Sequence, residues 1–369
     1  MRYAWQQDDW PRFTFHLGEI EGSLLAFVQE AGTTSGLLEG LNDELREEAV
    51  IDLMISEAMK TSEIEGEMFS REDVLSSVKN RLSLINPPLK VSNQGAQGVA
   101  DLIVKVRESF PQPLSEETLF EWHTLLMAND RFVSPGQWRT GTDPMQVVSG
   151  RIDKPKVHFE APPSSQVATE MTDFIDWFNE TAPDGKSPIT HPVIRAGIAH
   201  LYFETIHPFE DGNGRIGRAL AEKALSQGLR SPALVMLSST IEAHRQDYYN
   251  ALETAQRDNE ITAWLSYFSK TVLESQRYAK EQIRFVLLQT KFFDRFRDQL
   301  NDRQLKAIKR MFEAGPKGFE GGMNPKKYIS LTKTSKATAT RDLQQLLSMG
   351  AFKKEGGGHS TRYHLELEY

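Results

Sequence analysis

The chain has 369 residues, with 43 Lys and Arg against 51 Asp and Glu, and a formal net charge of −8. Hydrophobic residues at 39% and charged residues at 25% are ordinary for a globular protein and argue against wholesale disorder. Cysteine is absent, which excludes disulfides, cysteine-based zinc sites and thiol nucleophiles. The apolar runs fall far short of the ~20 residues of a membrane helix, and the N-terminus has no apolar signal core. We therefore expect a cytoplasmic protein with no membrane partner.

Charge is unevenly distributed along the chain. Residues 301–369 carry 13 Lys and Arg against 7 Asp and Glu, a net charge of +6, so residues 1–300 carry −14. This break in composition predicts a separate module near residue 300. Proline-containing stretches at 84–90 and 111–115 predict further boundaries, because proline disfavours helix for itself and for the residue before it.

Most of the chain shows the apolar spacing of amphipathic helices. The clearest case is 191–206, where Val193, Ile194, Gly197, Ile198, Leu201 and Tyr202 form one broad stripe. The same spacing predicts helices over 43–64, 118–128, 167–178, 215–227, 245–258 and 261–299. Residues 140–163 differ, because 146–148 and 156–159 flank a turn containing Gly150, which predicts a β-hairpin. The expected fold class is mainly α.

The strongest chemical signal lies between the helices expected at 191–206 and 215–227. From His207 to Arg218 the residues are His-Pro-Phe-Glu-Asp-Gly-Asn-Gly-Arg-Ile-Gly-Arg. Glycines on both sides of Asn213 allow a tight turn, and its backbone N–H groups at a helix N-terminus can cradle a phosphate. Arg215 and Arg218 are three residues apart and share a helix face, which suits a polyphosphate.

Two further residues of this segment carry chemistry. Asp211 supplies a hard oxygen ligand for Mg²⁺. His207 is a base that can be neutral at pH 7, and it stands just ahead of the phosphate cradle. We expect Phe209 to anchor the loop in the core.

Other interpretations of this segment are weaker. Gly212, Gly214 and Gly217 match the dinucleotide-binding fingerprint, but that motif needs a preceding strand and an acidic residue ~20 positions on. Here the preceding segment is predicted helical, and residues 234–237 are apolar. His191, His200 and His207 could be zinc ligands, but they lack the i, i+4 spacing of a zinc-binding helix. A lone Gly-Asn-Gly would favour a simple turn; the added His, Asp and two Arg argue against one.

The segment 207–218 resembles the full signature of the Fic family, His-Pro-Phe-x-Asp-Gly-Asn-Gly-Arg-x-x-Arg. The stretches 136–139, 161–163 and 191–200 resemble landmarks of the Fic core, and residues 3–5 with 10–11 resemble the domain that often precedes it. The resemblance implies three domains: an N-terminal helical domain with an inhibitory helix at 1–90, a Fic catalytic core with a β-hairpin flap at 91–299, and a module at 300–369.

Fic proteins usually transfer AMP from ATP to a protein hydroxyl, so the resemblance implies a nucleotidyltransferase, a protein adenylyltransferase that uses ATP and Mg²⁺. His207 resembles the base that deprotonates a Tyr, Thr or Ser hydroxyl of the target protein. Asp211 resembles the Mg²⁺ ligand between the α- and β-phosphates. The implied nucleotide contacts are Gly212, Asn213 and Gly214 as the anion hole, Arg215 on the phosphate chain and Arg218 on the γ-phosphate. The hairpin at 147–159 resembles the flap that aligns the target backbone by strand addition.

A second motif lies at the end of the helix expected at 43–64. Thr61 and Glu65 are four residues apart and share a face, and Gly66 is typical of a residue that ends a helix. By itself this segment favours an ordinary solvated helix end. Beside the Fic signature it resembles the family's inhibitory motif, Ser/Thr-x-x-x-Glu-Gly/Asn, which implies that Glu65 pairs with Arg218 and denies it to the γ-phosphate. The chain then resembles the N-terminally inhibited class.

The basic tail predicts three helices, at 302–314, 324–331 and 335–349, followed by a β-hairpin. This order resembles a winged helix-turn-helix that binds DNA through residues 300–369. The third helix would offer Ser335, Lys336, Thr338, Thr340 and Arg341, and the wing Lys353, Lys354, His359 and Arg362, to DNA phosphates. A module that docks a protein, or a second copy of the chain in a homodimer, is the alternative.

The residues leave further functions open. The same site could remove AMP from a target, with Glu65 orienting a water, or it could sense nucleotide in a DNA-binding regulator. Tyr248 and Tyr249 are either sites of self-modification or core aromatics, and aromatic rings are usually buried. The sequence specifies neither the target protein nor the nucleotide.

Overall fold

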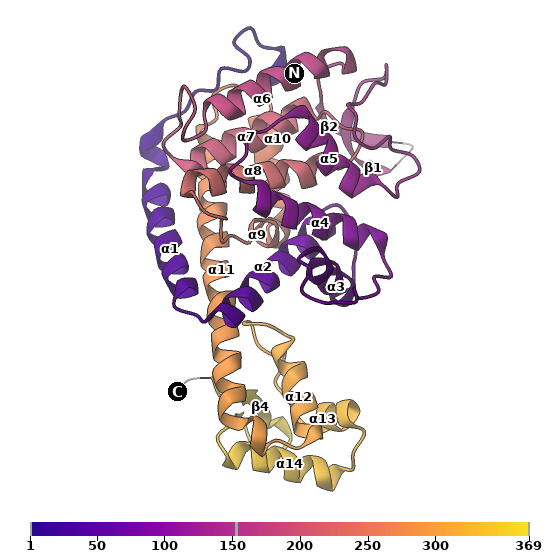
Figure 1. Ribbon diagram of the computed structural model, residues 1–369, viewed down its shortest axis with the longest axis vertical. Coiled ribbons are helices and arrows are strands. Elements are labelled where there is room, and N and C mark those ends of the chain that lie inside the picture. Colours follow the sequence, from indigo (N-terminus) through magenta and orange to yellow (C-terminus); the bar gives the residue numbers. More distant parts are fainter. Residues whose placement is uncertain (1, 152–153, 368–369) are drawn as a thin grey trace. The chain divides into compact units, whose positions relative to one another are not determined.

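The structure is a computed structural model, and it describes residues 2–151 and 154–367. Residues 152 and 153, within the predicted hairpin, and the side chain of His359, in the predicted wing, lie outside the described residues. The chain divides into two compact units (Figure 1). The first holds the residues up to Gly36 and Val50–Ala279, and the second holds Leu37–Ala49 and the residues from Lys280 onward. The three-domain division at residues 90 and 299 stays a prediction.

Helices dominate the first unit, as the apolar spacing predicts. In chain order they are α1 (Glu21–Glu39), α2 (Asp43–Ile64), α3 (Arg71–Arg81), α4 (Gln94–Ser109), α5 (Glu116–Met127), α6 (Ser164–Glu180), α7 (Pro192–Ile206), α8 (Asn213–Leu229), α9 (Leu237–Ala243), α10 (Arg245–Ala255) and α11 (Thr262–Phe296), with 3₁₀ turns at Ala4–Gln6 and Leu17–Glu19. The last residues of α1, the first of α2 and the last of α11 belong to the second unit. The mainly helical fold class is confirmed.

No helix is predicted from the sequence at α1, α3, α4 or α9, although buried Val99, Leu102 and Val106 of α4 do have helical spacing. In α1 the glycines Gly22, Gly32 and Gly36 have low helix propensity, so tertiary packing outweighs the local preference. Helices α3 and α4 begin at side-chain caps, which are a local signal of a different kind. Ser70 Oγ accepts the Asp73 N–H at 3.1 Å, and Asn93 Oδ1 accepts the Gly95 N–H at 2.9 Å.

The predicted hairpin is present as β1 (Gln146–Arg151) and β2 (Lys154–Glu160), which pair antiparallel with an irregularity between Val147 and Val148. The placement of Gly150 in the turn is wrong. The ladder continues past it to the Arg151–Lys154 pair, so Gly150 lies within β1 opposite Pro155.

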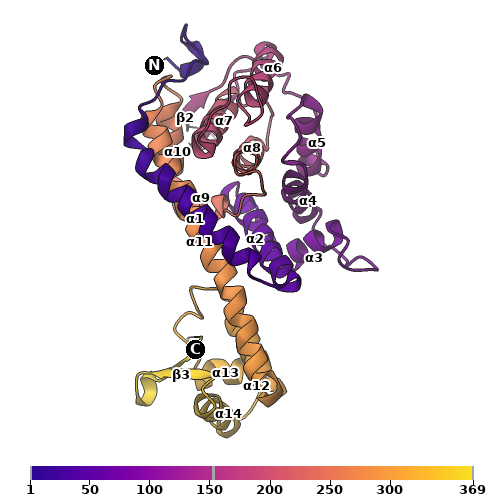
Figure 2. The same ribbon diagram turned by 60° about the vertical axis from the view of Figure 1, so that its left-hand side comes forward.

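Helices α7 and α8 pack together at the centre of the first unit, and α4 and α5 also contact α8 (Figure 2). All residues of α7 from Val193 to Ile206 are buried, and Pro192 occupies the first helical position, where a missing N–H costs nothing. Helix α8 comes close to α7 at Gly217, where glycine is needed because any Cβ atom would collide with the Glu204 carboxylate. The loop that connects α7 to α8 is thus held at both ends by helices packed in the core.

The second unit contains the helices and the hairpin predicted for the tail. They are α12 (Asp302–Phe312), α13 (Pro325–Thr332), α14 (Lys336–Ser348), β3 (Phe352–Glu355) and β4 (Arg362–Leu365), with 3₁₀ turns at Arg297–Gln299 and Gly358–Ser360. Strands β3 and β4 pair antiparallel. The core of this unit includes Ile308, Met311, Leu343, Leu346 and Phe352.

A buried polar network fixes α14 against α12 and α13. Asp342, which is 3% exposed, accepts hydrogen bonds from Arg303 Nε at 2.9 Å and from the Tyr328 hydroxyl at 3.0 Å.

Of the helices that the structure describes, none is both long and apolar enough to cross a membrane.

Candidate functional site

The predicted signature forms the connection between α7 and α8. His207 caps α7 in the left-handed conformation, with φ at +50°, and its N–H donates to the Phe203 carbonyl at 2.9 Å. Gly212, with φ at +79°, then precedes Asn213, where α8 begins. The first N–H groups of a helix have no partner within the helix. The segment therefore presents a helix N-terminus a few residues after an imidazole.

Asn213 shapes this loop from within. Its side-chain Oδ1 accepts the Phe209 N–H at 2.9 Å, and its Nδ2 donates to the Phe209 carbonyl at 2.8 Å. The asparagine side chain is therefore occupied, and an anion at this turn would meet backbone N–H groups. Phe209 is fully buried, as expected for the anchor of the loop.

Two residues to which the sequence analysis assigned no role support the loop from outside. Arg139, which is 4% exposed, donates from Nε to the His207 carbonyl at 2.8 Å and from Nη2 to the Ile206 carbonyl at 3.2 Å. The buried ring of His123 stacks on Phe209 with centroids 4.0 Å apart. Burial lowers the pKa of Arg139 to about 10 and the pKa of His123 to about 4. Arg139 belongs to the stretch 136–139, which resembles a landmark of the Fic core, but its bonds to residues 206 and 207 are visible only in three dimensions.

His207 is held in its neutral form. Burial, and then the nearby Arg139 cation, lower its pKa to about 4, so the imidazole is uncharged at neutral pH. Its Nδ1 lies 3.8 Å from an oxygen of Glu204, a buried residue of α7 that the sequence analysis did not single out. Burial raises the pKa of Glu204 to about 8. A neutral imidazole can accept a proton, which is the property a general base needs.

The structure brings Thr61, Glu65 and Arg218 together. Arg218 is 3% exposed, and it donates from Nη2 to Glu65 Oε1 at 2.7 Å and from Nε to the Thr61 hydroxyl at 2.9 Å. Burial acts to raise the pKa of Glu65, but Arg218 outweighs it, and the net pKa lies below the ordinary value. The carboxylate is therefore ionised at neutral pH and pairs with the guanidinium.

The end of α2 places these side chains. Gly66 has φ at +87°, and its N–H donates to the Glu63 carbonyl at 3.1 Å, while the Glu67 N–H donates to the Ser62 carbonyl at 3.0 Å. These two bonds form a Schellman motif, which terminates a helix at a left-handed residue. Glu65 and Glu67 thus stand on either side of the turn.

Glu67 is a further residue that the sequence analysis missed. Its Oε2 accepts a hydrogen bond from Arg215 Nη1 at 2.6 Å, and the Arg215 side chain is only 5% exposed. Glu67 follows the recognised motif directly, but 148 residues separate it from Arg215, so no local spacing indicates this contact.

Helix α2 is also fastened to the core before its end. Glu57, which is 6% exposed, accepts the backbone N–H groups of Ser238 at 2.8 Å and Ser239 at 3.2 Å, around the start of α9. Burial raises the pKa of Glu57, and these hydrogen bonds oppose the shift.

Asp211 fits a Mg²⁺ ion that is bound mainly through phosphates. Its side chain is 58% exposed, and its Oδ1 accepts the Gly212 N–H at 2.5 Å and lies 3.9 Å from Arg215 Nη2. Within the described parts of the chain no three His, Cys, Asp or Glu side chains gather as metal ligands, so His191, His200 and His207 do not form a zinc site. Mg²⁺ commonly uses one or two carboxylates and takes its other ligands from water and phosphate.

The tyrosines proposed for self-modification differ in environment. Tyr248 is 2% exposed, and its hydroxyl lies 2.8 Å from His200 Nε2, which favours its interpretation as a core residue. Tyr249 is partly buried against the same core.

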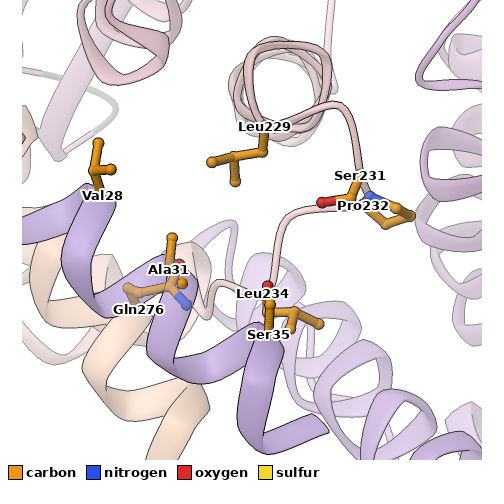
Figure 3. A pocket seen from close by; sticks show the side chains of 9 residues that line it. Val28, Ala31, Ser35, Leu229, Ser231, Pro232, Leu234 and Gln276 are labelled. Carbon is orange, nitrogen blue, oxygen red and sulfur yellow. The ribbon is translucent and has the colours of Figure 1, made fainter. Parts of the chain in front are cut away.

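A pocket of about 190 Å³ lies elsewhere in the first unit (Figure 3). Its lining comes from α1, from the end of α8 and its connection to α9, and from α11: Val28, Ala31, Gly32, Ser35, Leu229, Ser231, Pro232, Leu234 and Gln276. None of the residues predicted to bind nucleotide lines this pocket, so it is separate from the site at the start of α8.

Comparison with known proteins agrees with this geometry. A model of the Fic/DOC family matches residues 113–225, and a model described as a domain of unknown function (DUF4172) matches residues 3–84. The protein adenylyltransferase fic-1 of Caenorhabditis elegans is 29% identical over 167 residues, which cover 45% of this chain and 28% of the worm protein. The chain thus matches less than a third of this relative's length.

Solved structures share the fold. A Fic family protein from Desulfovibrio desulfuricans superposes with a TM-score of 0.54 at 22% identity, covering 96% of this chain and 98% of that one. Residues 134–508 of Fic-1 from C. elegans superpose with a TM-score of 0.50 at 20% identity, covering 70% of this chain and 72% of that one. Residues 113–225 are thus a Fic domain by their match to the family model, and the solved structures show the same fold. This domain is homologous to that of protein adenylyltransferase fic-1.

Proposed function

We propose that the chain is an autoinhibited protein AMP-transferase that moves AMP from ATP to a hydroxyl side chain of a protein. The observation that carries this proposal is the arrangement around α8. A neutral His207 precedes a helix N-terminus, and two buried arginines, Arg215 and Arg218, follow on the same helix. Homologues named protein adenylyltransferases support the reaction class.

In the proposed reaction the target hydroxyl attacks the α-phosphorus of ATP. His207 takes the hydroxyl proton, the new oxygen–phosphorus bond forms, and the bond to pyrophosphate breaks. Arg215 and Arg218 hold the phosphate chain and neutralise the charge that develops on the leaving group. Bound Mg²⁺, held by Asp211, would neutralise phosphate charge. Arg139 keeps His207 in place through the backbone carbonyl at that residue.

The brake in this proposal is the end of α2. Glu65 occupies Arg218, so the γ-phosphate cannot reach that guanidinium without displacing the carboxylate. The hairpin β1–β2 would align the target backbone, and Val148 and Val157 leave 51% and 41% of their surface exposed there. Target recognition would then depend on main-chain bonds and on a few side-chain contacts.

Labelling of a lysate with α-labelled ATP tests the proposal. The Glu65→Gly protein is expected to transfer label to one or a few proteins, and mass spectrometry of the modified peptides should show AMP on a Tyr, Thr or Ser. Phosphorylation would transfer the unlabelled γ-phosphate, so the protein would stay unlabelled and its peptides would show a phosphate in place of AMP. A different mass addition would indicate another nucleotide, and no transfer would contradict the proposal.

The second unit supports DNA binding as a second function. Lys336, Thr340 and Arg341 of α14 are exposed, as are Lys353 and Lys354 of β3. The Ser335 hydroxyl accepts the Thr338 N–H at 3.2 Å, so this serine acts as the cap of α14. Exposed cations on a helix and on an adjacent hairpin are suited to phosphate contacts.

The full chain with Lys353→Glu and Lys354→Glu together should bind duplex DNA roughly tenfold more weakly than the wild type at low salt, because two phosphate contacts are lost. Fluorescence anisotropy across a salt series measures this. Lys186→Glu, an exposed change in the first unit, is the control and should leave DNA affinity unchanged. Absence of salt-dependent binding by the wild type would instead favour a protein-docking module.

A further inference from the structure

The site holds a second carboxylate beside the expected brake. Glu67 Oε2 lies 2.6 Å from Arg215 Nη1, while Glu65 Oε1 lies 2.7 Å from Arg218 Nη2. Each of the two arginines expected to contact phosphates is thus paired with a glutamate from one three-residue stretch. Gly66 separates the two glutamates and turns the backbone between them.

The two arginines differ in how many of their N–H groups have hydrogen-bond partners. Arg218 also donates to the Thr61 hydroxyl at 2.9 Å and to the Thr61 carbonyl at 3.0 Å. Arg215 keeps a buried Nε–H that has no hydrogen-bond partner among the described residues. A guanidinium binds an oxyanion best through two parallel N–H bonds. Glu67 therefore leaves part of Arg215 unsatisfied, and a phosphate could satisfy it.

Burial makes both guanidinium groups depend on an anion. The Arg215 and Arg218 side chains are 5% and 3% exposed, so water solvates neither well. An uncompensated buried charge is strongly unfavourable, and an anion must therefore be present in each position. In this structure Glu65 supplies it at Arg218. At Arg215 the direct partner is Glu67, and Asp211 Oδ1 lies further away, 3.9 Å from Nη2.

We propose that the carboxylates of Glu65 and Glu67 occupy the positions of two phosphate groups of the nucleotide, with Glu67 taking the phosphate position at Arg215. This inference rests on the proposed nucleotide site. The ligand of this site is then a linear polyphosphate. At each of the two arginines, one of its phosphate groups would replace a glutamate carboxylate. Inorganic tripolyphosphate, which has no adenosine, should compete with the two carboxylates at the same two positions.

Calorimetric titration of the full-length protein with inorganic tripolyphosphate, and separately with Mg-ATP, tests the inference. Glu67→Gln should tighten tripolyphosphate binding by roughly threefold to tenfold, because a half-exposed ion pair of modest strength is removed. Glu65→Gln should tighten it more, and the double variant should bind more tightly than either single variant. Glu63→Gln is the matched control, since Glu63 pairs with Lys60 in the same last turn of α2.

The outcomes separate the inference from the proposed function. If Glu65→Gln binds both ligands more tightly but Glu67→Gln matches the wild type and Glu63→Gln, the phosphate position assigned to Glu67 is wrong. If the double variant binds neither ligand while thermal unfolding shows it folded, the nucleotide site itself is wrong. Glu67 is 44% exposed, so its replacement by Gln should leave the unfolding temperature nearly unchanged.

Discussion

Glu65→Gly is expected to raise the incorporation of label from α-labelled ATP into protein by about 30-fold over the wild type. In the wild type, binding of the γ-phosphate must first displace the Glu65 carboxylate from Arg218. Breaking charge-assisted hydrogen bonds of this kind costs ~2 kcal/mol, and each 1.36 kcal/mol corresponds to about tenfold in rate. Glycine also lacks any side chain that could reach the guanidinium.

The measurement is label incorporation per mole of protein, with ATP affinity determined in parallel. Glu63→Gln, at the same helix end, should stay at the wild-type level. Because Glu67 still pairs with Arg215 in the Glu65→Gly protein, the activation should be incomplete and should rise further when Glu67→Gln is added. Unchanged ATP binding and transfer in Glu65→Gly would show that this contact is no brake.

In the Glu65→Gly background, His207→Ala is expected to reduce transfer by roughly 10²–10⁴-fold, the usual contribution of a positioned general base. The alanine cannot accept the hydroxyl proton, while Arg215 and Arg218 remain on α8. ATP affinity should therefore change much less than the rate of transfer. The backbone carbonyl at residue 207, which Arg139 contacts at 2.8 Å, is also kept.

His191→Ala in the same background is the matched control, because His191 precedes α7 and its side chain makes no capping bond. Single-turnover transfer and equilibrium ATP binding should be measured for both variants. Persistence of near-normal transfer in the His207 variant would remove this residue from the role of base. A parallel loss of ATP binding would assign it to binding instead.

Local patterns in the sequence predict the parts of this site that lie close together along the chain. Helical spacing predicts that Thr61 and Glu65 share a face, and the signature predicts a helix starting near Arg215. The roles assigned to these residues stay predictions, but both arginines lie near the start of α8 and Thr61 and Glu65 meet Arg218.

Contacts between distant segments escape such patterns. Arg139 reaches the carbonyl at residue 207 across 68 positions, and Glu67 reaches Arg215 across 148. Neither contact follows from periodicity, because tertiary packing brings these separate segments together and both Arg139 and Glu67 lie outside the helices. The same limit explains α1, whose glycines disfavour helix locally while its buried apolar residues contribute to the core. The predicted turn at Gly150 is wrong for a similar reason, because a glycine is a local turn signal, whereas cross-strand pairing extends past this residue.

The fastening of Glu57 to the start of α9 bears on how far the chain must move to become active. Its carboxylate holds α2 by backbone hydrogen bonds eight positions before Glu65. Between these two points α2 is also buried, at Ser62 and Ile64, so the helix itself is anchored close to Glu65. The switch would then be a rearrangement of the partly exposed Glu65 and Glu67 side chains, on the fast timescale of rotamer changes, and α2 could stay docked throughout.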